Sequence, residues 1–177
     1  MKVLVWIEKL LERSGGPPTY VFNLKKSIIS NDQEDIVHFY PDLIKSESTK
    51  ISNEKGFLKS LLDLLPDFLR VNISVFRYLI LLKSFNNKKS LVDFEEYDFI
   101  HFHSTVDIYR NLNNLKVFKG SVILTPHSPK VFHLEIIEDI LKVEKKIILP
   151  WLYGKLVRID ALAFSRADIL IFPCEGA

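Results

Sequence analysis

The chain has 177 residues, of which 47% are hydrophobic and 26% charged, and its formal net charge at pH 7 is +2. This length and composition predict one globular domain, residues 1–177, and exclude an intrinsically disordered chain. The near-neutral charge argues against nucleic acid as a partner, because nucleic-acid-binding domains usually carry a strong basic excess. The single Cys174 excludes an internal disulfide, and Met1 leads straight into an apolar strand without a signal-peptide pattern. We therefore expect a cytoplasmic protein.

Five short apolar runs along the chain predict β-strands. They are nearly continuous in apolar residues instead of alternating, which is typical of parallel strands covered on both faces. The predicted strands cover 2–7, 35–40, 98–103, 121–126 and 167–173. Helical stretches are expected between them at 17–30, 57–85 with a break near Pro66, 105–117, and 134–166 with a break at Pro150. This alternation predicts an α/β fold, a Rossmann-like doubly wound parallel sheet flanked by helices.

A glycine pair, Gly15 and Gly16, lies between the first predicted strand and the first predicted helix. Glycine allows backbone amides to approach a ligand closely, and a helix N-terminus attracts an anion. The pattern is neither G-x-G-x-x-G nor G-x-x-x-x-G-K-[ST], so the usual dinucleotide and P-loop signatures are absent. Two interpretations stay open here, an anion site and a plain structural turn.

Histidines stand at the ends of two further predicted strands. The run "DFIHFHS" puts His101 and His103 on the same side of one strand, with His103 and Ser104 at its carboxyl end. The run "LTPHSP" puts His127 and Ser128 just beyond the next strand. We expect His101 to be a hydrogen-bonded core residue. No metal is expected, because no cysteine or acidic residue stands at zinc-ligand spacing from the histidines.

The strand ends predict a common crevice. Ligands of open α/β sheets bind outside the carboxyl ends of the strands, where the strand order reverses. With the sheet order 3-2-1-4-5, the first strand lies beside the fourth. We then expect Gly15, Gly16, His103 and His127 to face one crevice.

Four segments in order carry a family resemblance: the first strand with its Gly-Gly loop and helix, "DFIHFHS", "VILTPHS" and "RADILIFPCEGA". Together they resemble the N-terminal half of a GT-B glycosyltransferase. The resemblance is to the large retaining, family 4-like group that includes sucrose and glycan mannosyl- or glucosyltransferases. It spans Lys2 to Gly176. It implies transfer of a sugar from a nucleotide-diphosphate sugar to a glycan or lipid-linked acceptor, as in surface polysaccharide biosynthesis, without a cofactor or metal.

The resemblance also implies residue roles. His127 would be the catalytic-site histidine that orients the donor sugar, and Gly15 and Gly16 would lie by the diphosphate and the acceptor. His103, Ser104 and Ser128 would bind substrate. Asp168 and Glu175 would be structural.

Several residues depart from the family pattern, and part of the family machinery is not in this chain. Pro17 and Pro18 follow the glycines where small or acidic residues are common, and Cys174 replaces a serine. The family's basic pair and its two glutamates belong to a C-terminal donor-binding domain, which this chain does not contain. We therefore expect the chain alone to be an inactive acceptor-side half that shares its donor with that domain.

The predicted helical region 57–85 is rich in leucine and phenylalanine. Arg70, Asn72, Arg77 and Lys83 interrupt it, so it does not qualify as a membrane span. One interpretation is packing on the sheet. The other is an amphipathic surface that contacts the inner face of the membrane or a lipid-linked acceptor.

Two other functions stay open. One is a non-enzymatic Rossmann-like binding or partner subunit. The other is a nucleotide-dependent oxidoreductase or epimerase, which is disfavoured because G-x-G-x-x-G is absent and "HFYP" stands where an acidic residue is expected after the second strand.

Overall fold

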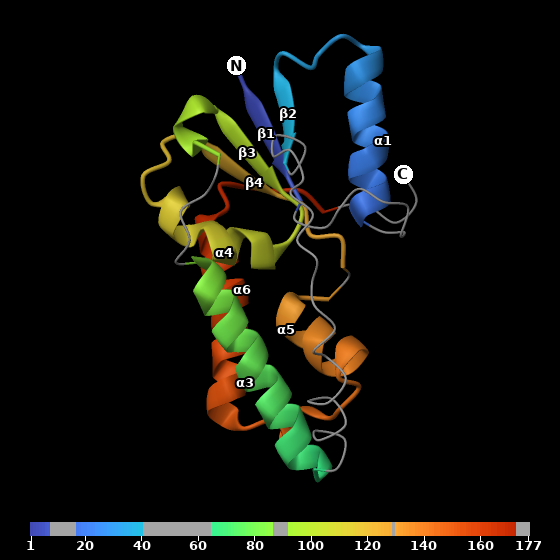
Figure 1. The fold of residues 1–177 in the computed structure, drawn as a ribbon, viewed down its shortest axis with the longest axis vertical. Helices are drawn as coiled ribbons and strands as arrows, with labels where there is room; N and C mark the ends of the chain where they lie inside the picture. The colour runs from blue at the N-terminus through green and yellow to red at the C-terminus, as the bar shows by residue number, and fades with distance from the viewer. Residues whose placement is uncertain (8–16, 41–64, 87–91, 129, 173–177) are drawn as a thin grey trace, which may run out of the picture.

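The computed structural model describes residues 1–7, 17–40, 65–86, 92–128 and 130–172. A five-stranded, all-parallel sheet forms the upper part of the molecule in Figure 1. The predicted α/β class and parallel sheet are therefore confirmed. The strands are β1 (Val3–Trp6), β2 (Val37–Tyr40), β3 (Phe99–Phe102), β4 (Ser121–Leu124) and β5 (Ile169–Leu170).

The strand order is β2-β1-β3-β4-β5, so the predicted order 3-2-1-4-5 is wrong. Strand β1 pairs with β3, with Trp6 opposite Phe102, and β3 pairs with β4, with Phe102 opposite Leu124. Local apolar patterns cannot specify on which side of β1 the third strand lies, because either side buries the same faces. This order has two consequences for the candidate site. Strands β3 and β4 are neighbours, and the strand order reverses between β1 and β3.

Helices cover the two faces of the sheet unequally. Helix α1 (Pro17–Ser30) lies along one face, where Val21 packs with Val5 and Phe39. On the other face, α4 (Thr105–Leu115) and α6 (Pro150–Arg166) cover Leu4, Trp6 and their neighbours. The central strand β1 is thus buried on both sides, as predicted. The prediction fails for β5, one of the two edge strands, whose Ile169 and Leu170 are exposed.

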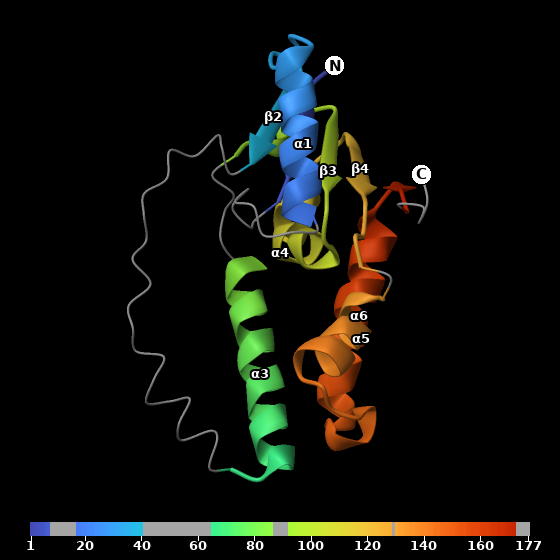
Figure 2. The same cartoon turned by 90° about the vertical axis from the view of Figure 1, so that its right-hand side faces the viewer.

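A helical part extends beyond the carboxyl ends of the strands (Figures 1 and 2). It contains α3 (Asp67–Asn86), α5 (Phe132–Leu134) and α6, which share a second apolar cluster that includes Val75, Leu82 and Leu156. Buried Asn72 links α3 to the start of α6: its side-chain amide donates to Ile147 O at 2.9 Å, and its Oδ1 accepts from Leu149 N at 2.8 Å.

Helices begin at both predicted proline positions, while residues 57–64 of the predicted helical region 57–85 lie outside the described residues. Helix α3 begins directly after Pro66, and Pro150 is the first residue of α6, where its missing N–H costs no hydrogen bond. The predicted helix over 134–166 is shorter than expected. After α5 come a π-helical stretch (Glu135–Ile140) and a 3₁₀ turn (Lys145–Ile147). Lys142 separates them with a positive φ of 53°, which no right-handed helix accommodates.

None of the helices in the described ranges is long and apolar enough to cross a lipid bilayer.

Two glycines provide a paired test of this packing. A Cβ on Gly120, just before β4, would collide with the backbone oxygen of Asp98, whereas a Cβ on Gly154 in α6 meets no atom within 4 Å. We expect Gly120→Ala to lower the free energy of unfolding by about 1–3 kcal/mol through overpacking. Gly154→Ala should raise it by about 1 kcal/mol through helix propensity. Urea unfolding of both variants measures this, and equal shifts of the same sign would contradict the packing described.

Candidate functional site

A hydrogen-bonded pair of histidines lies at the carboxyl end of the sheet. His103 directly follows β3, and His127 follows β4 by three residues. His103 Nδ1 and His127 Nε2 are 2.8 Å apart, with ring centroids 5.0 Å apart. The prediction that these two histidines come together is confirmed. The cause is the observed strand order, which makes β3 and β4 neighbours, and not the order predicted from sequence.

A second hydrogen bond repeats the first one step earlier along the same strands. His101 Nε2 lies 2.7 Å from Thr125 Oγ1, and the His101 and His103 rings are 4.3 Å apart. His101 and His103 thus each bond a residue 24 positions later in the chain. The prediction that His101 is hydrogen-bonded is confirmed, but its side chain is half-buried and not part of the apolar core.

The first turns of α1 contribute an aromatic ring to the same place. The Tyr20 ring lies 5.1 Å from His127 and 5.6 Å from His103, centroid to centroid. Tyr20 is 48% exposed, whereas His103 is only 3% exposed. Tyr20 and the half-buried His127 therefore form the accessible side of the cluster, and His103 lies behind them.

Burial keeps the histidine cluster uncharged. Desolvation, with a smaller contribution from His127, lowers the pKa of His101 from 6.5 to about 4. Desolvation and the neighbouring His101 and His127 lower the pKa of His103 to about 2. Desolvation also lowers the pKa of His127. At neutral pH the three imidazoles can donate and accept hydrogen bonds but carry no positive charge for binding an anion.

The two predicted serines have local structural bonds. Ser104 caps α4, because its hydroxyl oxygen accepts from Val106 N at 3.1 Å. Ser128 Oγ accepts from Lys130 N at 3.3 Å. Each hydroxyl keeps its own hydrogen for donation, so their substrate-binding role stays a prediction.

Gly15 and Gly16, together with Cys174 and Glu175, lie outside the described residues. Asp168 does have the structural role that the resemblance implies. Its Oδ2 accepts from Val122 N at 2.8 Å, and its own N–H donates to Val122 O at 2.8 Å, so it joins β5 to β4.

Sequence reasoning missed Tyr20, Thr125 and the pairing of His133 with Asp160. Buried Asp160 on α6 accepts at Oδ2 from both His133 N at 2.9 Å and His133 Nδ1 at 2.7 Å, which attaches α5 to α6. The predicted helix start at residue 17 places Tyr20 in the first turn after the glycine pair, but its contact with His127 depends on the tertiary structure. No local sequence pattern predicts the bond between His133 and Asp160, which are 27 residues apart.

Within the described parts of the chain, no group of three or more histidine, cysteine, aspartate or glutamate side chains is arranged to hold a metal ion.

Comparison with protein-family models, with curated proteins and with solved structures gives no match to this chain.

The buried histidines predict an acid-sensitive fold. Their pKa values lie below 6.5 in the folded chain, so between pH 6.5 and about 4 the unfolded chain binds more protons. The contribution of these neutral histidines to the free energy of unfolding is therefore fully present above pH 6.5. It decreases as the pH falls, by up to about 1.4 kcal/mol per pH unit for each such histidine. Urea unfolding at pH 7.5 and 5.0 measures the loss, and His103→Leu should reduce it. An equal loss in wild type and variant would contradict this origin.

Proposed function

We propose that the chain is the N-terminal, acceptor-side part of a retaining GT-B-type glycosyltransferase that uses a nucleotide-diphosphate sugar. The observation that carries the proposal is the hydrogen-bonded pair of His103 and His127 at the carboxyl ends of adjacent parallel strands. It adjoins the point between β1 and β3 where the strand order reverses, the usual ligand position in open α/β sheets.

The chemistry of the cluster suits a sugar better than a phosphate. Neutral imidazoles exchange hydrogen bonds with hydroxyl groups, which also donate and accept. An exposed aromatic ring such as Tyr20 offers an apolar face against which the C–H face of a sugar ring can lie. In the proposed reaction, His127 contacts the transferred sugar or the acceptor hydroxyl.

The leaving diphosphate needs a different partner, because the histidine cluster is uncharged. Backbone N–H groups before α1 are one candidate, as the resemblance implies for Gly15 and Gly16. Basic side chains of a donor-binding domain are the other. The chain alone would then bind a sugar weakly and turn over little. In this arrangement the chain contacts the sugar and the acceptor, and the diphosphate is bound elsewhere. The proposed acceptor is a glycan or a lipid-linked sugar, as in surface polysaccharide assembly.

Sugar binding provides the test. In ligand-observed NMR, we expect monosaccharides and nucleotide-diphosphate sugars to show saturation transfer from the wild-type chain. His127→Ala and Tyr20→Ala should each reduce the sugar-proton signals several-fold, and Tyr20→Phe should retain them because the ring stays.

His38→Ala is the matched control, since His38 on β2 bonds Tyr97 and lies outside the cluster. Loss of signal in this control but not in His127→Ala would contradict the proposed site. A nucleobase signal without any sugar signal would favour the rival nucleotide-dependent oxidoreductase or epimerase.

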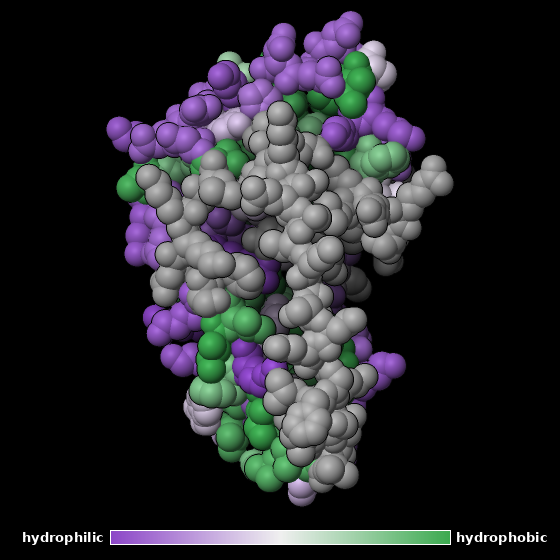
Figure 3. Space-filling view, in the orientation of Figure 1, coloured by the Kyte–Doolittle hydropathy of each residue, from purple (hydrophilic) through white to green (hydrophobic). Residues whose placement is uncertain are grey.

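A second proposal concerns the solvent-facing side of α3. Leu69, Ile73, Phe76 and Ile80 follow helical spacing on the side opposite the buried Val71, Val75 and Leu82, and we call them the α3 stripe. Phe76 and Ile80 are 46% and 51% exposed. Figure 3 shows apolar surface gathered at this lower part of the molecule. A helix that is apolar on both sides is typically buried on both sides, by another part of the protein, by a partner or by a membrane.

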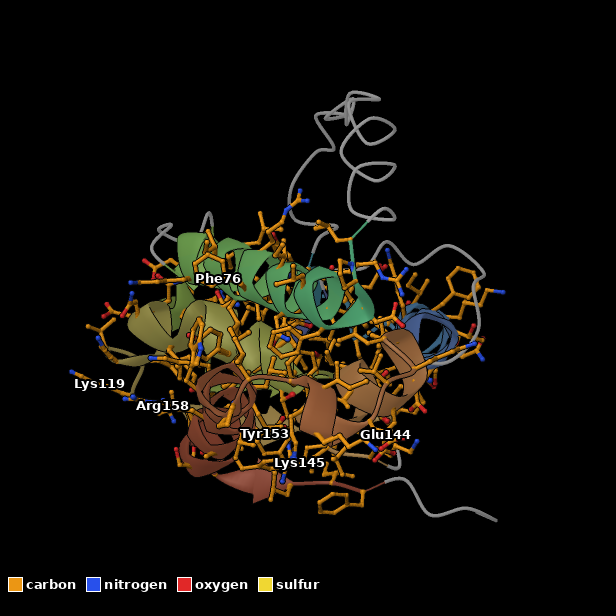
Figure 4. All side chains as sticks on the ribbon, turned by 90° about the horizontal axis from the view of Figure 1, so that it is seen from below. Phe76, Lys119, Glu144, Lys145, Tyr153 and Arg158 are labelled. Atoms are coloured by element: carbon orange, nitrogen blue, oxygen red, sulfur yellow. The ribbon has the colours of Figure 1, made fainter. Side chains whose placement is uncertain are left out.

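We propose an anionic membrane surface as the occupant. Arg77 and Lys83 flank the α3 stripe, and neither has an ion-pair partner among the described residues. Trp151 of α6 contacts Phe76 edge-on at 6.0 Å and enlarges the apolar area. Lys145, which lies over the Tyr153 ring, is on the other side of α6 from Phe76 in Figure 4, so it is not part of this surface. The apolar centre and the basic flanks of this surface are typical of a helix that lies in the plane of the membrane–water interface.

Vesicle co-sedimentation tests the membrane proposal. We expect the chain to bind vesicles that contain anionic lipid and to release them at high salt, because screening weakens the basic contribution. Phe76→Ser with Ile80→Ser should abolish most of the binding. Arg77→Ser and Lys83→Ser should weaken it by about fivefold each, as expected for about 1 kcal/mol per basic residue.

Val117→Ser is the control, since Val117 is 60% exposed but lies outside the α3 stripe. Equal binding of all variants, or indifference to anionic lipid, would contradict the membrane proposal.

A further inference from the structure

His103 cannot contact a ligand in this structure. It is 3% exposed, and three aromatic rings surround it: His101 at 4.3 Å, His127 at 5.0 Å and Tyr20 at 5.6 Å, measured between centroids. The role expected for His103 in substrate binding must therefore be indirect. The one polar contact of the ring within the described residues is the hydrogen bond to His127.

That hydrogen bond contains a single proton between two neutral rings. Either His103 Nδ1–H donates to His127 Nε2, or His127 Nε2–H donates to His103 Nδ1. The two arrangements differ at the other nitrogen of His103. In the first, His103 Nε2 carries only a lone pair. In the second, it carries an N–H.

The surroundings of His103 Nε2 favour the first arrangement. This atom is fully buried and has no hydrogen-bond partner in the described part of the chain. Among backbone groups, a buried N–H without an acceptor is rarer than an acceptor without a donor, and we apply the same preference to the ring. His103 is then the donor in the pair, and His127 accepts at Nε2.

We propose that His103 is a positioning residue that fixes His127 as the Nδ1–H tautomer. His127 Nε2 is occupied, so it is not free to act as a base. His127 Nδ1 has no hydrogen-bond partner in the described ranges, and its N–H is the group left to donate to a ligand. In the reaction proposed above, on which this last step rests, the acceptor is an oxygen atom of the bound sugar.

Histidine tautomers can be measured without substrate. In the full 177-residue chain labelled with ¹⁵N-histidine, two-bond ¹H–¹⁵N spectra distinguish a protonated from an unprotonated ring nitrogen. We expect His127 to show a protonated Nδ1 and an unprotonated Nε2 at pH 7.5, and His103 to show the same pattern. In His103→Phe, which keeps a ring but removes the donor, we expect His127 to shift towards the Nε2–H form. His103→Leu is a second variant in case the phenylalanine ring disturbs folding.

His101→Phe is the matched control, because His101 lies two residues away on the same strand and bonds Thr125 instead of His127. It should leave the His127 tautomer unchanged. A wild-type His127 with a protonated Nε2 would overturn the proposal, as would a tautomer that His103→Phe or His103→Leu leaves unaltered. Since this readout contains no sugar, it can fail while the sugar-binding test succeeds, and the reverse also holds.

Discussion

The parallel pairing of β3 with β4 is the constraint on which the candidate site depends. With Phe102 opposite Leu124, the next residues of both strands leave the sheet side by side. His101 then reaches Thr125, and His103 reaches His127, each across the same offset of 24 residues. A slip of one residue would turn these side chains to the opposite face, where Phe102 and Leu124 now pack in the apolar core. The register that closes the core also assembles the site.

Burying His103 and half-burying His101 and His127 is costly unless the three imidazoles stay neutral and hydrogen-bonded. The cluster meets this condition by bonding histidines to each other and to Thr125 instead of to carboxylates. His133 provides the contrast in the same molecule, since it bonds the buried carboxylate of Asp160 and joins two helices. An uncharged cluster with one accessible imidazole is chemically better suited to hydroxyl groups than to phosphate. The proposed sugar contact is for this reason assigned to a different part of the site from the binding of the diphosphate.

The helical part has its own polar links, and these leave one side of α3 uncovered. Asn72 connects α3 to the segment before α6, and Asp160 connects α5 to α6. The inner sides of these helices therefore pack against each other. The outer side of α3 keeps Phe76 and Ile80 exposed between basic residues. The carboxyl ends of the strands face this helical part, so the proposed membrane surface and the proposed sugar site belong to the same end of the sheet.

Local patterns were sufficient for some features and insufficient for others. The apolar runs identified each strand found among the described residues, and Pro66 and Pro150 marked where α3 and α6 begin. The spacing of His101 and His103 put both on one side of the chain at β3. The strand order, the exposure of β5 and the place of Tyr20 beside His127 were not predictable in this way. By itself, the sequence determined which segments become strands and helices, because that choice depends on neighbouring residues. Only the tertiary structure decided that β3 lies between β1 and β4 and so brings His103 to His127, because strand order depends on contacts between segments far apart in the chain.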